Sequence, residues 1–161
     1  MPSARAQSKT ILAELLGTLL LALTINMLNS SDLDVLTKAV GSGAAYTALV
    51  STTGGLLNPA ATLTAALSGK LAAHAALVLA VVQITGAALG AVVQVLFVQG
   101  VQFGHRGPGC VSTTGASMVH VAGWETLLTA LLVASYGAEH APVAVGASQL
   151  LATLTGANNA E

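Results

Sequence analysis

Charged side chains are scarce in this sequence of 161 residues: Asp, Glu, Lys and Arg make up 7% of it, whereas soluble domains carry roughly 25%. Apolar residues account for 54%. Five basic and six acidic residues cannot cover the outside of a water-soluble protein of this size. The composition therefore excludes a soluble globular protein and predicts a multi-pass integral membrane protein whose outer surface contacts the lipid bilayer. It does not indicate which membrane.

Cysteine, paired histidines and basic clusters are also missing or nearly so. The single cysteine, Cys110, excludes an internal disulfide and a thiolate-ligated metal site, and the four histidines show no paired spacing. We therefore expect no metal site and no cofactor. A net charge of −1 without a basic cluster argues against nucleic acid as a partner. Because no nucleophile–base pair or carboxylate pair stands out either, we do not expect an enzyme.

Long apolar runs separated by polar turns predict an all-α membrane protein. Residues 1–9 form a short polar tail, and residues 10–161 form a single transmembrane domain. A cleaved signal peptide is an alternative for the first run, but that run is longer than the roughly 7–15 residues of the apolar region of such a peptide. We expect about five spanning helices, at residues 11–28, 37–52, 71–99, 118–138 and 141–156, with a loop at 101–115. In the third of these, Gly86, Ala87 and Gly90 lie on a shared stripe of small residues that suits close helix contact.

Positive charges suggest how the spans are oriented. Arg5, Lys9 and Lys70 should lie on the cytoplasm-like side of the membrane, with Lys38 and Arg106 on the opposite side. This bias of three to two supports the five-span topology.

The openings of the first and fourth predicted spans share a pattern, Glu14-Leu-Leu-Gly-Thr-Leu-Leu and Glu125-Thr-Leu-Leu-Thr-Ala-Leu. The second and fifth spans also correspond, through Ala39-Val-Gly and Ala144-Val-Gly. Chance matches between alanine-rich helices are the alternative, but these matches keep their order. An odd number of helices in each copy inverts the second copy in the bilayer. We therefore predict an inverted repeat, with a first copy at 10–100 and an incomplete second copy at 117–161.

The apolar segment at residues 56–67 is too short to span, because a helix needs about 20 residues to cross a bilayer. Asn58 is a favoured helix N-cap and Pro59 a favoured first helical residue, so a short helix should begin here. One interpretation is an ordinary helix outside the membrane. Because the segment is apolar and Lys70 follows it directly before the next span, we favour a re-entrant half-helix.

Backbone without regular structure at membrane depth is tolerated only where it lines a water-filled cavity or is buried in protein. We therefore expect the carbonyl groups of Gly54, Gly55, Leu56 and Leu57 to line a pore. The positive end of the half-helix would repel protons and cations, while Asn58 donates hydrogen bonds to passing water.

The stretch that contains Gly54-Gly-Leu-Leu-Asn58-Pro59-Ala60-Ala-Thr62 is similar to the first NPA box of the aquaporin, or major intrinsic protein, family. The sequence around Glu14 resembles the first helix of the family, Gln83-Ile-Thr-Gly-Ala resembles its third helix, and the sequence around Glu125 resembles its fourth. The resemblance covers nearly the whole chain. It implies an aquaporin-like inverted-repeat bundle and a passive channel for water or small neutral solutes. Asn58, Pro59 and Ala60 would then form the pore motif, and Glu14 and Glu125 would accept hydrogen bonds from re-entrant loops.

The sequence also departs from the family pattern. The family has a second NPA box followed by an arginine and a sixth span, and none of these has a counterpart here, so we expect a C-terminally truncated bundle. The filter position on the fifth helix, which is His in water-selective members, corresponds to Thr153. For Glu125, which follows Trp124, the alternative is a solvated end of the helix.

The departures leave two functions open. In the first, further membrane protein subunits or a second copy of the chain complete a conducting pore. In the second, the chain is a non-conducting structural subunit of a larger membrane complex.

Overall fold

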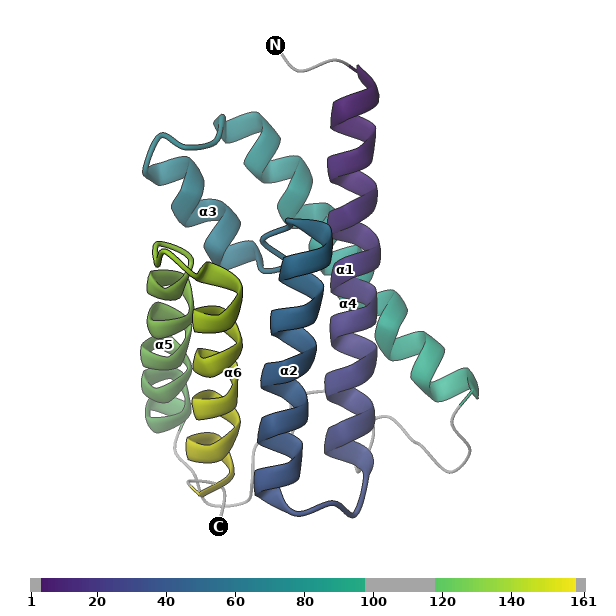
Figure 1. Cartoon of the computed structure of the whole chain (residues 1–161), viewed down its shortest axis with the longest axis vertical. Coiled ribbons are helices and arrows are strands. Elements are labelled where there is room, and N and C mark those ends of the chain that lie inside the picture. Colours follow the sequence, from purple (N-terminus) through teal and green to yellow (C-terminus); the bar gives the residue numbers. More distant parts are fainter. Residues whose placement is uncertain (1–3, 98–117, 159–161) are drawn as a thin grey trace.

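The structure, a computed structural model, describes residues 4–97 and 118–158, and all regular secondary structure in these ranges is α-helical (Figure 1). The helices are α1 (Ala4–Ser30), α2 (Val35–Thr53), α3 (Pro59–Leu67), α4 (Ala73–Phe97), α5 (Met118–Ser135) and α6 (Ala141–Asn158). Five long helices and one short helix thus lie where the sequence predicts them. The polar tail predicted at residues 1–9 is helical from Ala4 onward, and the predicted loop at 101–115 lies outside the described residues.

Helix length decides which elements can cross a bilayer. Two stretches are long and apolar enough by composition, Arg5–Ser30 with 26 residues and Ala73–Phe97 with 25. Helices α2, α5 and α6 have 19, 18 and 18 residues. At 1.5 Å per residue they measure about 27–29 Å, close to the hydrocarbon thickness of about 30 Å. By the same arithmetic the nine residues of α3 measure about 14 Å, so α3 cannot cross.

Apolar side chains cover much of the outside of this bundle, and several polar side chains lie inside it. Large apolar side chains on α4 face outward, for example Leu77 at 64% and Leu96 at 69% relative exposure. The interior contains an apolar cluster around Val50, and also Glu14, Gln83 and other polar side chains that are almost fully buried. A membrane protein shows this distribution, because lipid accepts apolar side chains and polar ones must find partners inside the protein.

Helices α1 and α4 cross at very short range. A Cβ atom added to Gly86 would lie 2.6 Å from the carbonyl oxygen of Leu15, and one added to Gly90 would lie 2.5 Å from that of Leu19. No side chain fits there, so the two backbones touch directly. The small-residue stripe predicted around Gly86 and Gly90 is therefore confirmed as a helix contact.

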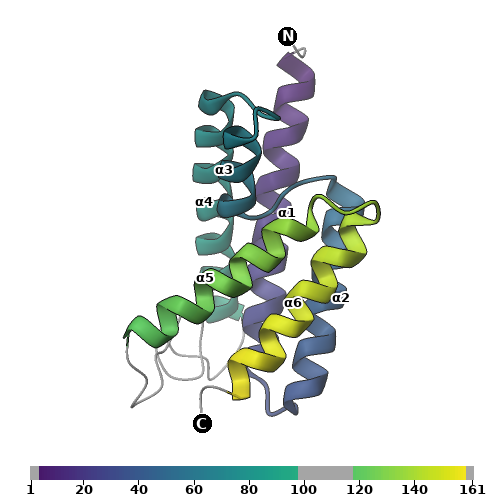
Figure 2. The same ribbon diagram turned by 90° about the vertical axis from the view of Figure 1, so that its left-hand side faces the viewer.

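Helices α2 and α6 form a second close pair, and α1 packs against α2 to join the two pairs (Figures 1 and 2). A Cβ atom on Gly43 would lie 2.6 Å from the carbonyl oxygen of Gly146, and one on Gly146 would lie 1.8 Å from the hydroxyl oxygen of Thr47. These two helices are the ones that correspond between the predicted repeats.

The basic residues are distributed unequally between the two ends of the bundle. Helix α1 begins, α3 ends and α4 begins at one end, while the turn between α1 and α2 lies at the other (Figure 1). Arg5, Lys9 and Lys70 therefore lie at one end and Lys38 at the opposite end, as the topology prediction requires. Arg106 lies outside the described residues.

Candidate functional site

The short helix α3 begins at an N-cap, as the sequence predicts. The backbone of Asn58 is extended, with φ −149° and ψ 122°, and its side-chain oxygen accepts the backbone N–H groups of Ala60 at 2.8 Å and Ala61 at 3.3 Å. Pro59 follows as the first helical residue, where its missing N–H costs nothing. The helix starts inside the molecule and runs toward the end at which α4 begins (Figures 1 and 2).

The non-helical backbone before Asn58 is held by a buried carboxylate. The N–H of Leu56 donates to Glu14 Oε1 at 2.8 Å, and the N–H of Leu57 donates to Glu14 Oε2 at 2.9 Å. Glu14 lies on α1 and is only 2% exposed. One ionisable side chain thus satisfies two backbone donors that have no helical partner, which is the contact that the resemblance implied for Glu14.

A second buried side chain links this carboxylate to α3. Gln83 on α4 donates from Nε2 to Glu14 Oε2 at 2.8 Å and lies 2.8 Å from the hydroxyl of Thr62. The Thr62 hydroxyl in turn donates to the backbone carbonyl of Asn58 at 3.0 Å. Gln83 and Thr62 are both fully buried. The network therefore fixes α1, α4 and the start of α3 relative to one another.

Leu57 adopts a left-handed backbone conformation, with φ +50°, and no other non-glycine residue in the described ranges has a positive φ. This conformation costs an L-residue roughly 1–2 kcal/mol. Its side chain is 3% exposed and lies over Gly17, where an added Cβ would come within 2.5 Å of Leu57 Cδ2. The absent side chain at Gly17 and the hydrogen bond that the Leu57 N–H donates to Glu14 together hold Leu57 in this conformation.

Two tyrosines approach the same segment from other helices. The hydroxyl of Tyr136, just after α5, donates a short hydrogen bond to the carbonyl oxygen of Leu56. The same hydroxyl lies 3.3 Å from that of Tyr46 on α2, which is 2% exposed. Sequence reasoning did not assign either tyrosine to the site, because Tyr136 is 80 residues from Leu56 in the chain. The scarcity of aromatic residues was the only available signal.

The four residues expected to line a pore differ in exposure. Gly55 and Leu57 are buried, Leu56 is half-buried with its carbonyl bonded to Tyr136, and Gly54 is exposed. That the carbonyl groups of all four line a pore stays a prediction, but the carbonyl of Leu56 already accepts the Tyr136 hydroxyl. The reason is that the connection between α5 and α6 reaches over this segment.

Two further candidates do not join the network. Glu125 is exposed near the middle of α5, so within the described residues it neither faces the interior and supports a loop nor lies at a solvated end of the helix. No second re-entrant segment packs on α5 within the described residues to bury it. Thr153 is half-buried on α6, and its hydroxyl donates to the carbonyl of Gln149 at 3.0 Å within the same helix. Across residues 4–97 and 118–158, no three His, Cys, Asp or Glu side chains gather in a group able to hold a metal ion.

The family model described as major intrinsic protein matches residues 2–158, which is nearly the whole chain. A search of the curated proteins finds no match.

Proposed function

This chain belongs to the major intrinsic protein family, and we propose that its re-entrant segment forms one half of a pore that further helices complete. Members of the family are integral membrane proteins that act as passive channels for water or small solutes, and they are not enzymes. The finer proposal concerns this chain: its permeant is water or a small neutral solute, and Asn58, Pro59 and Ala60 form the pore motif.

The observation that carries the proposal is that α3 begins inside the bundle and that buried hydrogen bonds hold the backbone before it. Two backbone N–H groups before Asn58 donate to the buried Glu14 carboxylate, at 2.8 and 2.9 Å. Holding the start of α3 in this way requires a buried carboxylate, which is costly inside a membrane protein. We infer that the arrangement has a function beyond connecting α2 to α4. A channel supplies that purpose, because a fixed helix N-terminus disfavours cations and protons on a water path.

The orientation of Asn58 follows from its cap. Its side-chain oxygen accepts the N–H groups of Ala60 and Ala61, so the amide nitrogen is the end that faces away from the helix. An amide nitrogen carries two N–H donors and no acceptor. We therefore expect Asn58 to donate to the oxygen of a permeating water or solute.

Completion of the pore requires a second half. Within the described residues α3 is the one half-helix. A pore whose barrier to cations and protons lies at its centre uses two half-helices whose N-termini face each other. The outer side of α3 is strongly exposed, with Leu63 at 50% and Leu67 at 90%, and Leu127 on the neighbouring α5 is 64% exposed. These apolar side chains give further helices a surface to pack on, whether they belong to another subunit or to a second copy.

A specific contact favours the alternative, a non-conducting structural subunit. The carbonyl oxygen of Leu56 accepts a hydrogen bond from the Tyr136 hydroxyl. The protein itself thus occupies a hydrogen-bond acceptor that water molecules passing in single file would need. In this alternative the same network preserves packing while the chain serves a larger membrane complex.

Water flux through proteoliposomes distinguishes these possibilities. The full chain is reconstituted alone, beside the variants Asn58→Asp and Asn29→Asp, and stopped-flow light scattering measures the rate of shrinkage. Asp is as good an N-cap as Asn but lacks the N–H donors and adds a charge, so Asn58→Asp tests the pore motif with α3 intact. Asn29 is exposed near the end of α1 and serves as the control.

We expect liposomes that contain the chain alone to shrink at nearly the same rate as empty liposomes. Fast flux that Asn58→Asp abolishes and Asn29→Asp preserves would contradict the need for a partner and would show a self-sufficient pore. If membranes that contain the completed assembly conduct water no faster than protein-free membranes, the result would support the structural subunit and contradict the proposal of a channel.

A further inference from the structure

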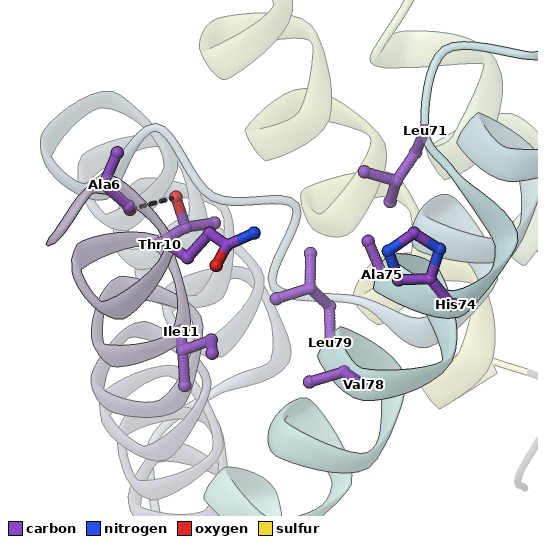
Figure 3. A pocket seen from close by; sticks show the side chains of 9 residues that line it. Ala6, Thr10, Ile11, Leu71, His74, Ala75, Val78 and Leu79 are labelled. Carbon is purple, nitrogen blue, oxygen red and sulfur yellow. Dashed lines mark hydrogen bonds between the residues drawn. The ribbon is translucent and has the colours of Figure 1, made fainter. Parts of the chain in front are cut away.

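A cleft of about 380 Å³ lies between the first turns of α1 and the first turns of α4, and neither Glu14 nor Gln83 lines it (Figure 3). Ile11, Val78 and Leu79 form its apolar floor, and the hydroxyl of Thr10 at its wall is already bonded to the carbonyl of Ala6 at 3.1 Å. His74 lies above the floor, beside Leu71. The lining is thus mostly apolar, and its polar side chains are Gln7, Thr10 and His74.

The position of the cleft in the bilayer follows from helix length. Helices α1 and α4 have 27 and 25 residues, so at about 1.5 Å per residue both exceed a hydrocarbon core of about 30 Å. Their first turns therefore reach the headgroup layer. From His74 to Leu79 the cleft extends about 7.5 Å along α4, from the headgroups toward the acyl chains.

The two chain segments that border the cleft carry charge of one sign. Arg5 and Lys9 lie on the first turns of α1, Lys70 directly precedes the cleft residue Leu71, and all three are exposed. Neither residues 4–12 nor residues 67–79 include an Asp or Glu. Basic sites between membrane helices near the bilayer surface attract anionic headgroups.

We propose that this cleft binds one anionic phospholipid, with an acyl chain against Val78 and Leu79 and the phosphate group near His74 and Lys70. The apolar floor selects a lipid over a soluble anion, because a free phosphate gains nothing from contact with Leu and Val. The surrounding basic residues select an anionic over a zwitterionic lipid. This site is independent of whether the chain conducts.

Native mass spectrometry of the full chain tests the acyl part of the proposal. The chain in detergent is titrated with phosphatidylglycerol and, separately, with phosphatidylcholine of the same acyl chains. Val78 and Val92 both lie on α4 at 49% and 44% exposure, but only Val78 lines the cleft, so Val78→Trp fills it and Val92→Trp is the matched control. We expect one tightly bound phosphatidylglycerol in the wild type and in Val92→Trp, and at least a tenfold weaker affinity in Val78→Trp. Equal loss in both variants would overturn the proposal.

The headgroup part has its own pair of variants. Lys70→Ala removes a charge beside the cleft, whereas Lys38→Ala removes one at the opposite end of the bundle. One basic residue near an anionic surface corresponds to a factor of about five in affinity. We expect Lys70→Ala to reduce the preference for phosphatidylglycerol over phosphatidylcholine about fivefold and Lys38→Ala to leave it unchanged. Equal affinities of the wild type for both lipids, or equal binding of water-soluble glycerol phosphate, would overturn the proposal.

Discussion

Replacement of Glu14 by glutamine tests whether one buried carboxylate holds the re-entrant segment. Three donors converge on it: the N–H groups of Leu56 and Leu57 and the side-chain amide of Gln83, all at 2.8–2.9 Å. Glu14→Gln keeps the shape of the side chain, but its own amide nitrogen then faces at least one of these donors. A buried donor without an acceptor costs about 1–3 kcal/mol, and a hydrogen bond to a charged group contributes about 1.5–3 kcal/mol. Together these effects predict a loss of about 2.5–6 kcal/mol in the free energy of unfolding.

The matched control is Glu125→Gln, since Glu125 also lies on an apolar helix but is exposed. Substitutions at such exposed positions change stability by roughly 0.5 kcal/mol or less. Unfolding by sodium dodecyl sulfate in mixed micelles, followed by circular dichroism, measures both variants. Hydrogen exchange measures the Leu56 and Leu57 amides directly, and we expect faster exchange there in Glu14→Gln alone. Equal stability losses in the two variants, or unchanged exchange at these amides, would refute the reasoning.

Three further changes have definite expected outcomes. Gly146→Ala places a Cβ against α2 and should separate α2 from α6 and destabilise the bundle, whereas Gly123→Ala, with nothing within 4 Å, should not; unfolding in mixed micelles compares them. Tyr136→Phe removes the hydroxyl from the Leu56 carbonyl, so hydrogen exchange of the re-entrant segment should accelerate while helix content by circular dichroism stays constant, and unchanged exchange would argue against the contact. Hydrogen bonds from the side chain and backbone of Thr37 lower the pKa of the Asp34 carboxyl below its ordinary value of 3.8. The cap therefore stabilises α2 above pH 3.8, and its contribution disappears as the pH falls through the lowered pKa. Asp34→Ala should remove this pH dependence of unfolding, and an unchanged acid profile would contradict the assignment.

Local signals in the sequence were enough to predict the helices and the start of α3. Asn58 and Pro59 are adjacent and act on the next few backbone groups, so their pattern determines a cap without knowledge of the rest of the fold. Gly86 and Gly90 were also informative, because small residues at helical spacing indicate a close helix contact whatever the partner is.

Contacts that depend on distant segments could not be predicted in the same way. Tyr136 reaches Leu56 only because the connection between α5 and α6 lies over the re-entrant segment, and nothing near Tyr136 in the sequence indicates this. Glu125 illustrates the opposite error. Its surroundings in the sequence match those of Glu14, but burial of a carboxylate depends on whether a loop with free N–H groups packs against it. Among the described residues that loop exists for Glu14 and not for Glu125.

The glycine contacts between α1 and α4 have a consequence for how the site responds to its surroundings. Gln83, Gly86 and Gly90 follow in order along α4 and meet Glu14, Leu15 and Leu19 in the same order along α1. A slide of one turn, about 5.4 Å, would bring either Gln83 or Gln94 to a place where only glycine fits. The pair therefore has a single register, and the distance between Glu14 and Gln83 cannot drift gradually. A thicker or thinner bilayer can tilt α1 and α4 together, but the hydrogen bonds that hold the start of α3 travel with them unchanged.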